Sequence, residues 1–403
     1  MNTVKLYQEN VYMKDFQAVV CSVVTDNDGS YVVLDRTAFF PEGGGQSSDI
    51  GFIGDNKVLH VYEEGDSVIH KLEEKCILKE GDNVDCFIDW ERRFDNMQRH
   101  CGEHILSGIF HREFGGVNRG FHMGEDYMTI DISLEENPDF TEITWDMAKH
   151  AELCANQVIW ENLPVITRRF ETREEAENLP LRKALAIDED VTIVCVGSTD
   201  NPSDCVACCG THPSTSGQVG LLKIYKVESN KGMYRIYFEA GKRALLDYDK
   251  KHDLITALGG RYSAGADDLM DKIKAQEEKQ KELRGDFFAL RQVVIKQRAA
   301  EIADEIKDGS VHSYSFPELK ADDLRNLAKN LDFTGSKLVV FLDDATSTAF
   351  LYSDGKTDCG KLIKDNAPVF SGKGGGRPDN AQAKFDTAEN MKLFADACEK
   401  ILR

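Results

Sequence analysis

Two short clusters of histidine and cysteine carry the clearest chemistry in this 403-residue sequence. His100 and His104 stand four residues apart, and Cys208 and His212 repeat that spacing later in the chain. Imidazole nitrogen and thiolate sulfur together suit tetrahedral zinc. One such pair arises by chance on many helices, but two pairs with the same spacing are a much stronger signal. The sequence therefore predicts one zinc ion per chain.

The spacing alone leaves the ligand set and the role of the metal open. Cys205 and Cys208 also have metal-ligand spacing, so a set of Cys205, Cys208 and the two early histidines is an alternative. Four protein ligands are typical of structural zinc, whereas a catalytic ion keeps one position free. Glu103 adjoins the predicted ligand face of the helix. It could act as a general base or orient a histidine.

Two functions can be considered from these residues alone, a zinc protease and an RNA-binding protein. The first cluster has the form H-x-x-E-H, which is the pattern of inverted zinc proteases. A protease of this kind would leave Cys208 and His212 unused, and the second cluster therefore counts against it. The other rival is a non-catalytic RNA-binding protein with a structural zinc.

Composition indicates a folded protein, with 41% apolar and 30% charged residues. No apolar run reaches the roughly 18 residues of a membrane span, and the first residues are polar rather than an export signal. The eleven cysteines are an odd number and show no disulfide framework. We therefore expect a cytoplasmic protein with free thiols and no contact with membranes.

The net charge of −21 argues against nucleic acid as a partner, because phosphate binding depends on Lys and Arg. Charge is not evenly spread, however. Residues 355–384 carry six basic side chains against three acidic ones. A local basic surface can therefore coexist with the acidic average.

Patterns along the chain predict an α+β multidomain protein with four regions. Short β-branched runs in residues 1–90, with a turn at 26–29, indicate a small β-barrel or sandwich, and we expect the barrel. Residues 91–250 mix helical and strand patterns and form an α/β domain that contains the zinc clusters. Residues 251–306 predict a long helical or coiled-coil arm. Residues 307–403 alternate strands and helices around a Gly-rich loop, which predicts a small α/β module.

Several motifs, in order, resemble one family. They are Thr37–Gln46 followed by Asp49–Gly51, RHCGEH, CCGTH, residues 231–236, and residues 374–383. The chain resembles, over nearly its whole length, the long form of the AlaX proteins, which are freestanding relatives of the editing region of alanyl-tRNA synthetase. The last motif is similar to the signature of the C-terminal DHHA1 module.

The resemblance implies hydrolysis of the ester in seryl-tRNA(Ala), and also in glycyl-tRNA(Ala), by a separate protein. It implies that the zinc ligands are His100, His104, Cys208 and His212. It further implies a C-terminal module that binds tRNA or forms a homodimer. No aminoacylation domain is expected, so the chain should not charge tRNA or bind ATP or alanine.

Other candidate site residues follow from the family motifs and from chemistry. A site that selects serine must hydrogen-bond its hydroxyl, because an apolar pocket rejects an added hydroxyl poorly. Thr37 and Gln46 are the candidates for this contact. The resemblance places His122 in the editing pocket, where it could shape the pocket or shuttle a proton. Glu103 is the candidate base on its chemistry alone, because it departs from the residue that the synthetase-linked domains commonly carry there. Backbone amides and cations near the end of the chain could contact tRNA phosphates, namely Lys373, Gly374, Gly375, Gly376 and Arg377.

Overall fold

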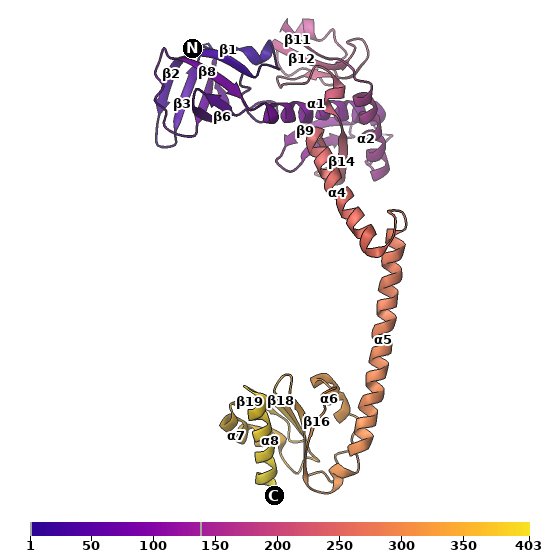
Figure 1. Cartoon of the computed structure of the whole chain (residues 1–403). Coiled ribbons are helices and arrows are strands. Elements are labelled where there is room, and N and C mark those ends of the chain that lie inside the picture. Colours follow the sequence, from indigo (N-terminus) through magenta and orange to yellow (C-terminus); the bar gives the residue numbers. More distant parts are fainter. Residues whose placement is uncertain (1, 138) are drawn as a thin grey trace. The chain divides into compact units, whose positions relative to one another are not determined.

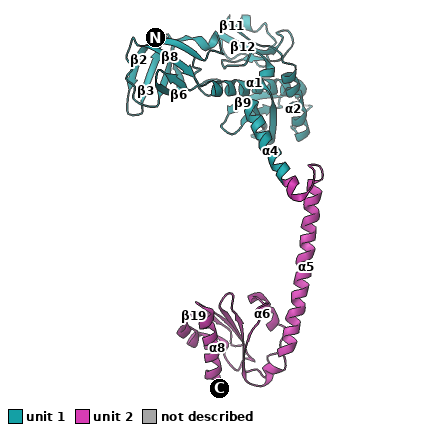
Figure 2. Cartoon of the chain, viewed as in Figure 1, with its two compact units in different colours: residues 1–257 teal, residues 258–403 magenta. Residues whose placement is uncertain are grey.

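The structure is a computed structural model that describes residues 2–137 and 139–403. The chain divides into two compact units, Met1–Ala257 and Leu258–Arg403 (Figure 2). Helices and β-sheets occur in both units, which confirms the predicted mixed α+β class. Among the described residues, no helix combines the length and apolar character needed to cross a bilayer.

The first unit begins with six strands that pair in a closed ring. Their order is β2 (Asp15–Thr25), β3 (Ser30–Leu34), β7 (Ser67–Leu72), β6 (Asn56–Glu64), β5 (Gly51–Ile53) and β8 (Asn83–Ile88), and β8 pairs back to β2. Alternate side chains point inward, as in β8, because successive residues of a strand face opposite sides. The short strands β1 (Val4–Lys5) and β4 (Arg36–Thr37) pair in parallel, and η1 (Leu6–Gln8) follows β1. The turn predicted at 26–29 does join β2 to β3.

Helix α1 (Trp90–Phe114) carries the first histidine cluster. Asp89 caps its start by accepting a hydrogen bond from the Arg92 amide, and Gly115 ends it with a positive φ of 64°. The helix packs on a sheet of order β14 (Leu222–Asn230), β15 (Met233–Ala240), β10 (Met128–Ser133) and β9 (Val117–Met123). Helix α2 (Trp145–Trp160) packs beside it (Figure 1).

A second sheet covers the other side of α1. It has the order β11 (Val165–Thr172), β12 (Glu189–Gly197) and β13 (Pro202–Ala207), with α3 (Arg173–Ala176) beside it. Two glycines allow both sheets to approach the helix. A Cβ on Gly102 would lie 2.6 Å from Ala240 Cβ, and one on Gly108 would lie 2.2 Å from the carbonyl oxygen of Ser203. The helix is therefore buried on several sides, and its histidines lie inside the unit.

One disulfide corrects the expectation that all thiols are free. Cys195 and Cys205 lie directly opposite each other in the β12–β13 ladder and are bonded. Both belong to a small apolar cluster of this sheet. Strand pairing brings together cysteines ten residues apart, which their scattered distribution in the sequence did not indicate. After β13 the chain passes the second metal motif, η2 (Ser216–Val219), the β14–β15 hairpin and α4 (Gly241–Tyr262).

The second unit contains α5 (Leu269–Ile302), η3 (Glu305–Lys307) and a five-stranded sheet. The strand order is β16 (Val311–Ser315), β17 (Leu338–Asp343), β18 (Thr348–Tyr352), β20 (Asn380–Phe385) and β19 (Gly372–Gly376). Helices α7 (Cys359–Asn366) and α8 (Ala388–Leu402), with η4 (Ala367–Phe370) between them, cover one face of the sheet. The end of α5 and α6 (Ala321–Ala328) cover the other. Strand β17 is buried along its whole length because both faces are covered.

The Gly-rich segment near the C-terminus is a strand rather than the predicted loop. Residues Gly372–Gly376 form β19, an edge strand paired with β20. A Cβ on Gly374 or Gly376 would lie 2.1 or 2.4 Å from backbone atoms of β20. Glycine is therefore required here for close backbone approach, not for the flexibility of a phosphate-binding loop.

Candidate metal centre

Four side chains converge from two parts of the first unit. His100, His104, Cys208 and His212 each present a ligand atom, and these atoms lie within 4.8 Å of one another. The Sγ atom of Cys208 is 3.5 Å from Nε2 of His100 and 3.4 Å from Nε2 of His212. Three imidazole nitrogens and one sulfur match the donor set of tetrahedral zinc, so the residues present fit this ion. The alternative set with Cys205 is wrong, because that sulfur is bonded to Cys195.

The two pairs reach this point for different reasons. His100 and His104 are one turn apart on α1, so both leave the same face of the helix. Cys208 lies just beyond β13, where its amide donates to the carbonyl of Thr192. A Cβ on Gly210 would lie 2.2 Å from the ring of His100. Only glycine therefore lets the second cluster close over the first.

Polar side chains hold the outer nitrogens of two of the histidines. Nδ1 of His100 is 2.9 Å from Oε1 of Gln46, and Nδ1 of His104 is 3.1 Å from Oδ2 of Asp204. These contacts leave Nε2 of each ring to face the common centre. Partners of this kind orient the imidazoles around a metal and raise their basicity. Gln46 therefore orients His100 at the site. Its side-chain amide is already hydrogen-bonded within the protein and is not free to bind a substrate hydroxyl.

Charge in this region is concentrated on buried groups. Burial opposes ionisation of the Cys208 thiol, but His100, His212 and His104 hold its pKa well below the ordinary value. Burial likewise opposes ionisation of Asp204, and the Arg182 guanidinium together with His104 holds the pKa of this carboxyl below its usual range. A thiolate is the form in which cysteine binds metal. The surroundings of Cys208 thus favour the thiolate form that zinc requires.

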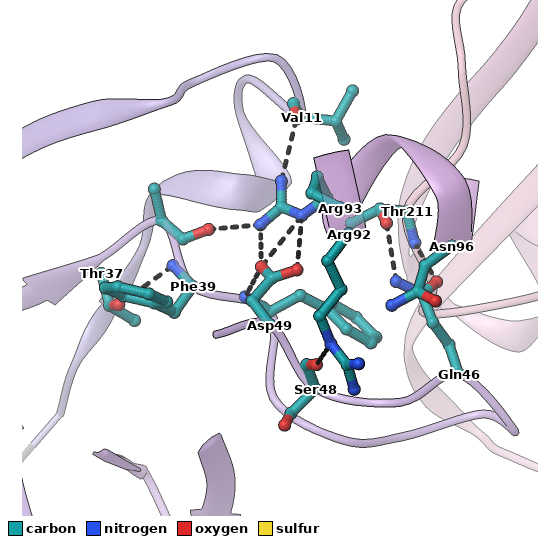
Figure 3. Close-up of polar contacts among 12 residues, drawn as sticks. Val11, Thr37, Phe39, Gln46, Ser48, Asp49, Arg92, Arg93, Asn96 and Thr211 are labelled. Atoms are coloured by element: carbon teal, nitrogen blue, oxygen red, sulfur yellow. Dashed lines mark hydrogen bonds and ion pairs between the residues drawn. The ribbon is translucent and has the colours of Figure 1, made fainter. Parts of the chain in front are cut away.

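The segment that carries Gln46 is fastened by the start of α1 (Figure 3). The buried guanidinium of Arg93 pairs with Asp49 and donates to the carbonyls of Val11 and Ala38. The carboxylate of Asp49 also accepts from the amide of Phe40. This Arg93–Asp49 clamp holds both ends of the Gly-rich segment. Within the segment, Oε1 of Gln46 contacts His100 and accepts from the amide of Thr211, while its Nε2 donates to the Thr211 hydroxyl.

The structure does not bring Thr37 or His122 to the centre. Thr37 is buried within the strand ring, where its hydroxyl lies 2.9 Å from Nε2 of His70. On β9 the side chains alternate, so Phe121 stacks on the ring of His100 while His122 is exposed on the other face. The predictions that these two residues read or process the substrate are therefore not supported by their positions.

A cavity of about 480 Å³ opens beside the metal centre. Its wall includes His100, His104, Cys208, Glu103 and Asn118. A volume of this size is within the range of small-ligand sites. Sequence reasoning found Glu103 but missed Asn118 and Asp204. The position of Asp204, four residues before Cys208, was the one available signal, because metal-binding histidines commonly contact a nearby carboxylate.

Replacing Asp204 with asparagine tests the role of this carboxylate. Asp204→Asn keeps the shape of the side chain but removes the charge that faces His104 and Arg182. We expect zinc affinity to fall by about 10- to 100-fold, as for other partners of metal-bound histidines. Competition with a chelating dye measures the affinity. Asp200→Asn, in the exposed loop between β12 and β13, is the control and should leave it unchanged.

Comparisons with known proteins relate these units to the enzymes that charge and edit tRNA. The model for class II (A) tRNA synthetases matches residues 4–92. The model for the second additional domain of threonyl- and alanyl-tRNA synthetases matches residues 191–237, and the DHHA1 domain model matches residues 308–403. These three matches relate the chain to the alanyl-tRNA synthetases and their additional domains.

Full-length similarity is more specific. The alanyl-tRNA editing protein AlaX-L of Pyrococcus horikoshii is 28% identical over 98% of both chains, which confirms the resemblance to the long-form AlaX proteins. The alanine–tRNA ligase of Thermococcus kodakarensis is 31% identical over the whole of this chain, but the match covers only 44% of that enzyme. The C-Ala domain of alanyl-tRNA synthetase from Aquifex aeolicus matches 24% of this chain, with 25% identity and a TM-score of 0.21.

Proposed function

We propose that this chain is a trans-editing hydrolase that deacylates seryl-tRNA(Ala), and also glycyl-tRNA(Ala), at a zinc ion held by His100, His104, Cys208 and His212. The observation that carries the proposal is the convergence of these four side chains, three of which (His100, His104 and Cys208) line a ligand-sized cavity. Zinc bound there would supply a Lewis acid that polarises the ester carbonyl. Full-length similarity to an alanyl-tRNA editing protein supports the same activity.

Substrate size explains why such an activity is needed. A synthetic pocket shaped for alanine rejects a small residue that differs by one hydroxyl or one methyl group only weakly, so a second hydrolytic site is the general remedy. The protease alternative finds no support in the geometry. A protease of the H-x-x-E-H type would not use Cys208 and His212, yet both lie against the two early histidines.

Deacylation assays with seryl-, glycyl- and alanyl-tRNA(Ala), run side by side, test the proposal. We expect the seryl and glycyl esters to be hydrolysed well above the uncatalysed rate and the alanyl ester to be spared. Removal of zinc with a chelator should abolish the difference. A chain that leaves the seryl ester intact, or cleaves the alanyl ester equally fast, does not have this function.

We keep the four-part division of the chain as part of the proposal. The strand ring would be the barrel, and the region around α1 would be the deacylase domain. Helix α5 would be the helical arm, and the last sheet with its helices would be the tRNA-binding or dimerising module. Aminoacyl-tRNA is a cytoplasmic substrate, and we place the protein in the cytoplasm for that reason.

The face of the C-terminal sheet beside its Gly-rich edge is the proposed tRNA contact. A concave surface there includes Arg325, Lys373, Lys384, Gly374 and Gly375. Lys373 and Lys384 are directly paired across β19 and β20, and like charges in that position destabilise a sheet. A bound phosphate would relieve this repulsion. Gly376 and Arg377 continue the same edge and could contact the same backbone.

Removing both lysines should weaken tRNA binding without affecting the chemistry. For the variant with Lys373→Ala and Lys384→Ala, we expect lower affinity for tRNA(Ala). The slope of log affinity against log salt should become shallower by about 0.7 to 0.9 for each phosphate that the variant no longer neutralises. Filter binding across a salt series measures both quantities. Lys364→Ala on α7 is the matched control, and an equal effect from this exposed lysine would contradict the assignment.

A homodimer through the C-terminal unit is the proposed assembly. Leu283, Phe287 and Leu290 lie on one face of α5 and are 58–67% exposed. Their spacing matches the seam of a coiled coil. A second copy of the chain would cover this apolar face. Sedimentation equilibrium measures the molar mass in solution and should give that of a dimer.

A further inference from the structure

Glu103 is the buried carboxylate of the cavity wall beside the metal centre. Its side chain is only 7% exposed. One oxygen, Oε1, accepts hydrogen bonds from the Ser107 hydroxyl at 2.6 Å and from the Asn118 amide at 2.8 Å. The carbonyl oxygen of the Asn118 side chain in turn accepts from the amide of Gly120 at 2.9 Å. Contacts from both α1 and β9 therefore fix the orientation of the carboxylate.

The second oxygen of Glu103 is in a different situation. Within the described chain, Oε2 accepts no hydrogen bond, and it lies 3.9 Å from Nε2 of His104. Among the described residues, none of the three cationic side chains of the same wall pairs with Glu103. Arg182 pairs with Asp204, Arg119 pairs with Glu136, and Lys183 forms no ion pair with this carboxylate. Glu103 lines the cavity, and its free oxygen can accept a hydrogen bond from a ligand there. A ligand that supplies a positively charged donor would form a charge-assisted hydrogen bond at this point.

We propose that Oε2 of Glu103 binds the α-ammonium group of the aminoacyl ester, an inference that rests on the proposed function. The amine of an aminoacyl ester is two bonds from the carbonyl carbon. An ester whose carbonyl is held at the metal centre therefore carries its ammonium group to an atom close by. The other carboxylate of the cavity wall, Asp190, belongs to an exposed residue on β12. Glu103 is the carboxylate that adjoins a ligand histidine.

This assignment defines a substrate class. Esters with a free α-amine are accepted, whereas N-acylated esters, which include peptidyl-tRNA, lack the charge and place an amide against the carboxylate. Glu103 then acts as a specificity-determining residue rather than as the base expected from sequence. The site would spare chains under synthesis while it clears mischarged amino acids.

The test compares kcat/KM for seryl-tRNA(Ala) and N-acetylseryl-tRNA(Ala). We expect the wild-type protein to prefer the free amine by about 10- to 100-fold, the range that one charge-assisted contact provides. Glu103→Gln keeps an oxygen for Ser107 and Asn118 but loses the charge. It should slow hydrolysis of the free-amine ester, leave the acetylated ester unchanged, and bring the ratio close to one. Glu113→Gln, on the exposed part of the same helix, should keep the wild-type ratio.

Each other outcome has a definite meaning. If Glu103→Gln slows both esters equally while zinc content and the melting temperature are unchanged, the residue acts on the reaction itself and the inference fails. Equal wild-type rates on the two esters would also overturn it, without any variant, while leaving the proposed function intact. A wild-type protein that hydrolyses neither ester would remove both the proposed function and this inference.

Discussion

Cys208→Ser is expected to remove bound zinc and, with it, deacylation of seryl-tRNA(Ala). Cys208 contributes the one sulfur of the four donors, and its Sγ lies within 3.5 Å of two ligand imidazoles. A serine hydroxyl stays protonated at neutral pH, so it cannot replace the thiolate. Metal affinity should fall by more than the factor of about 10 to 100 that is expected when a partner of a ligand histidine, such as Asp204, is lost. Zinc content after gel filtration and initial deacylation rates measure the two effects.

Cys76→Ser provides the control for this variant, because Cys76 is a half-buried thiol in the loop after β7 and is not one of the four donors. It should retain both zinc and activity. Full activity in a zinc-free Cys208→Ser protein would contradict the account. Peptidase activity that survives this substitution would instead favour the protease alternative, which needs only His100, His104 and a carboxylate.

Arg93→Ala is expected to lower the free energy of unfolding of the first unit by about 3–5 kcal/mol. Both Arg93 and Asp49 have fully buried side chains, so loss of the guanidinium leaves an unpaired carboxylate in the interior. Two backbone carbonyls, of Val11 and Ala38, also lose their donor. The three tryptophans all lie within Met1–Ala257, so urea unfolding followed by their fluorescence reports on this unit.

The neighbouring Arg92→Ala variant separates the buried clamp from a general effect of charge. Arg92 is partly exposed and donates to the carbonyl of Ser48. Its loss should cost about 1 kcal/mol, the net value of an ordinary hydrogen bond. Equal shifts in the two variants would mean that the Asp49 pair is not the main clamp. Because this clamp holds the segment that carries Gln46, we also expect Arg93→Ala to bind zinc more weakly.

The sequence predicted which four side chains converge better than it predicted the residues that surround them. His100 and His104 could be placed on one face of a helix, because the four-residue spacing fixes their relative direction. Spacing could not decide whether Cys205 or His212 joins Cys208 and the two early histidines. Strand register decided it, since Cys205 lies opposite Cys195 in the β12–β13 ladder. Register depends on pairing between segments, which a single sequence does not state.

The remaining errors have a similar origin. A shift of one residue along β9 exchanges the inward and outward side chains, so Phe121 occupies the place expected for His122. Gln46 was correctly placed near the site, but its role depends on contacts with His100 and Thr211, which come from other segments. The glycines of β19 indicated a loop because glycine adopts many backbone conformations. Glycine is needed here because the neighbouring strand β20 leaves no room for a Cβ.

X-ray absorption at the zinc edge of the purified full-length chain tests the joint binding of one ion most directly. We expect one zinc per chain, with three nitrogen neighbours at about 2.0–2.1 Å and one sulfur at about 2.3 Å. A shell with two sulfurs, or with oxygen in place of imidazole nitrogen, would show that His100, His104, Cys208 and His212 do not bind the ion together.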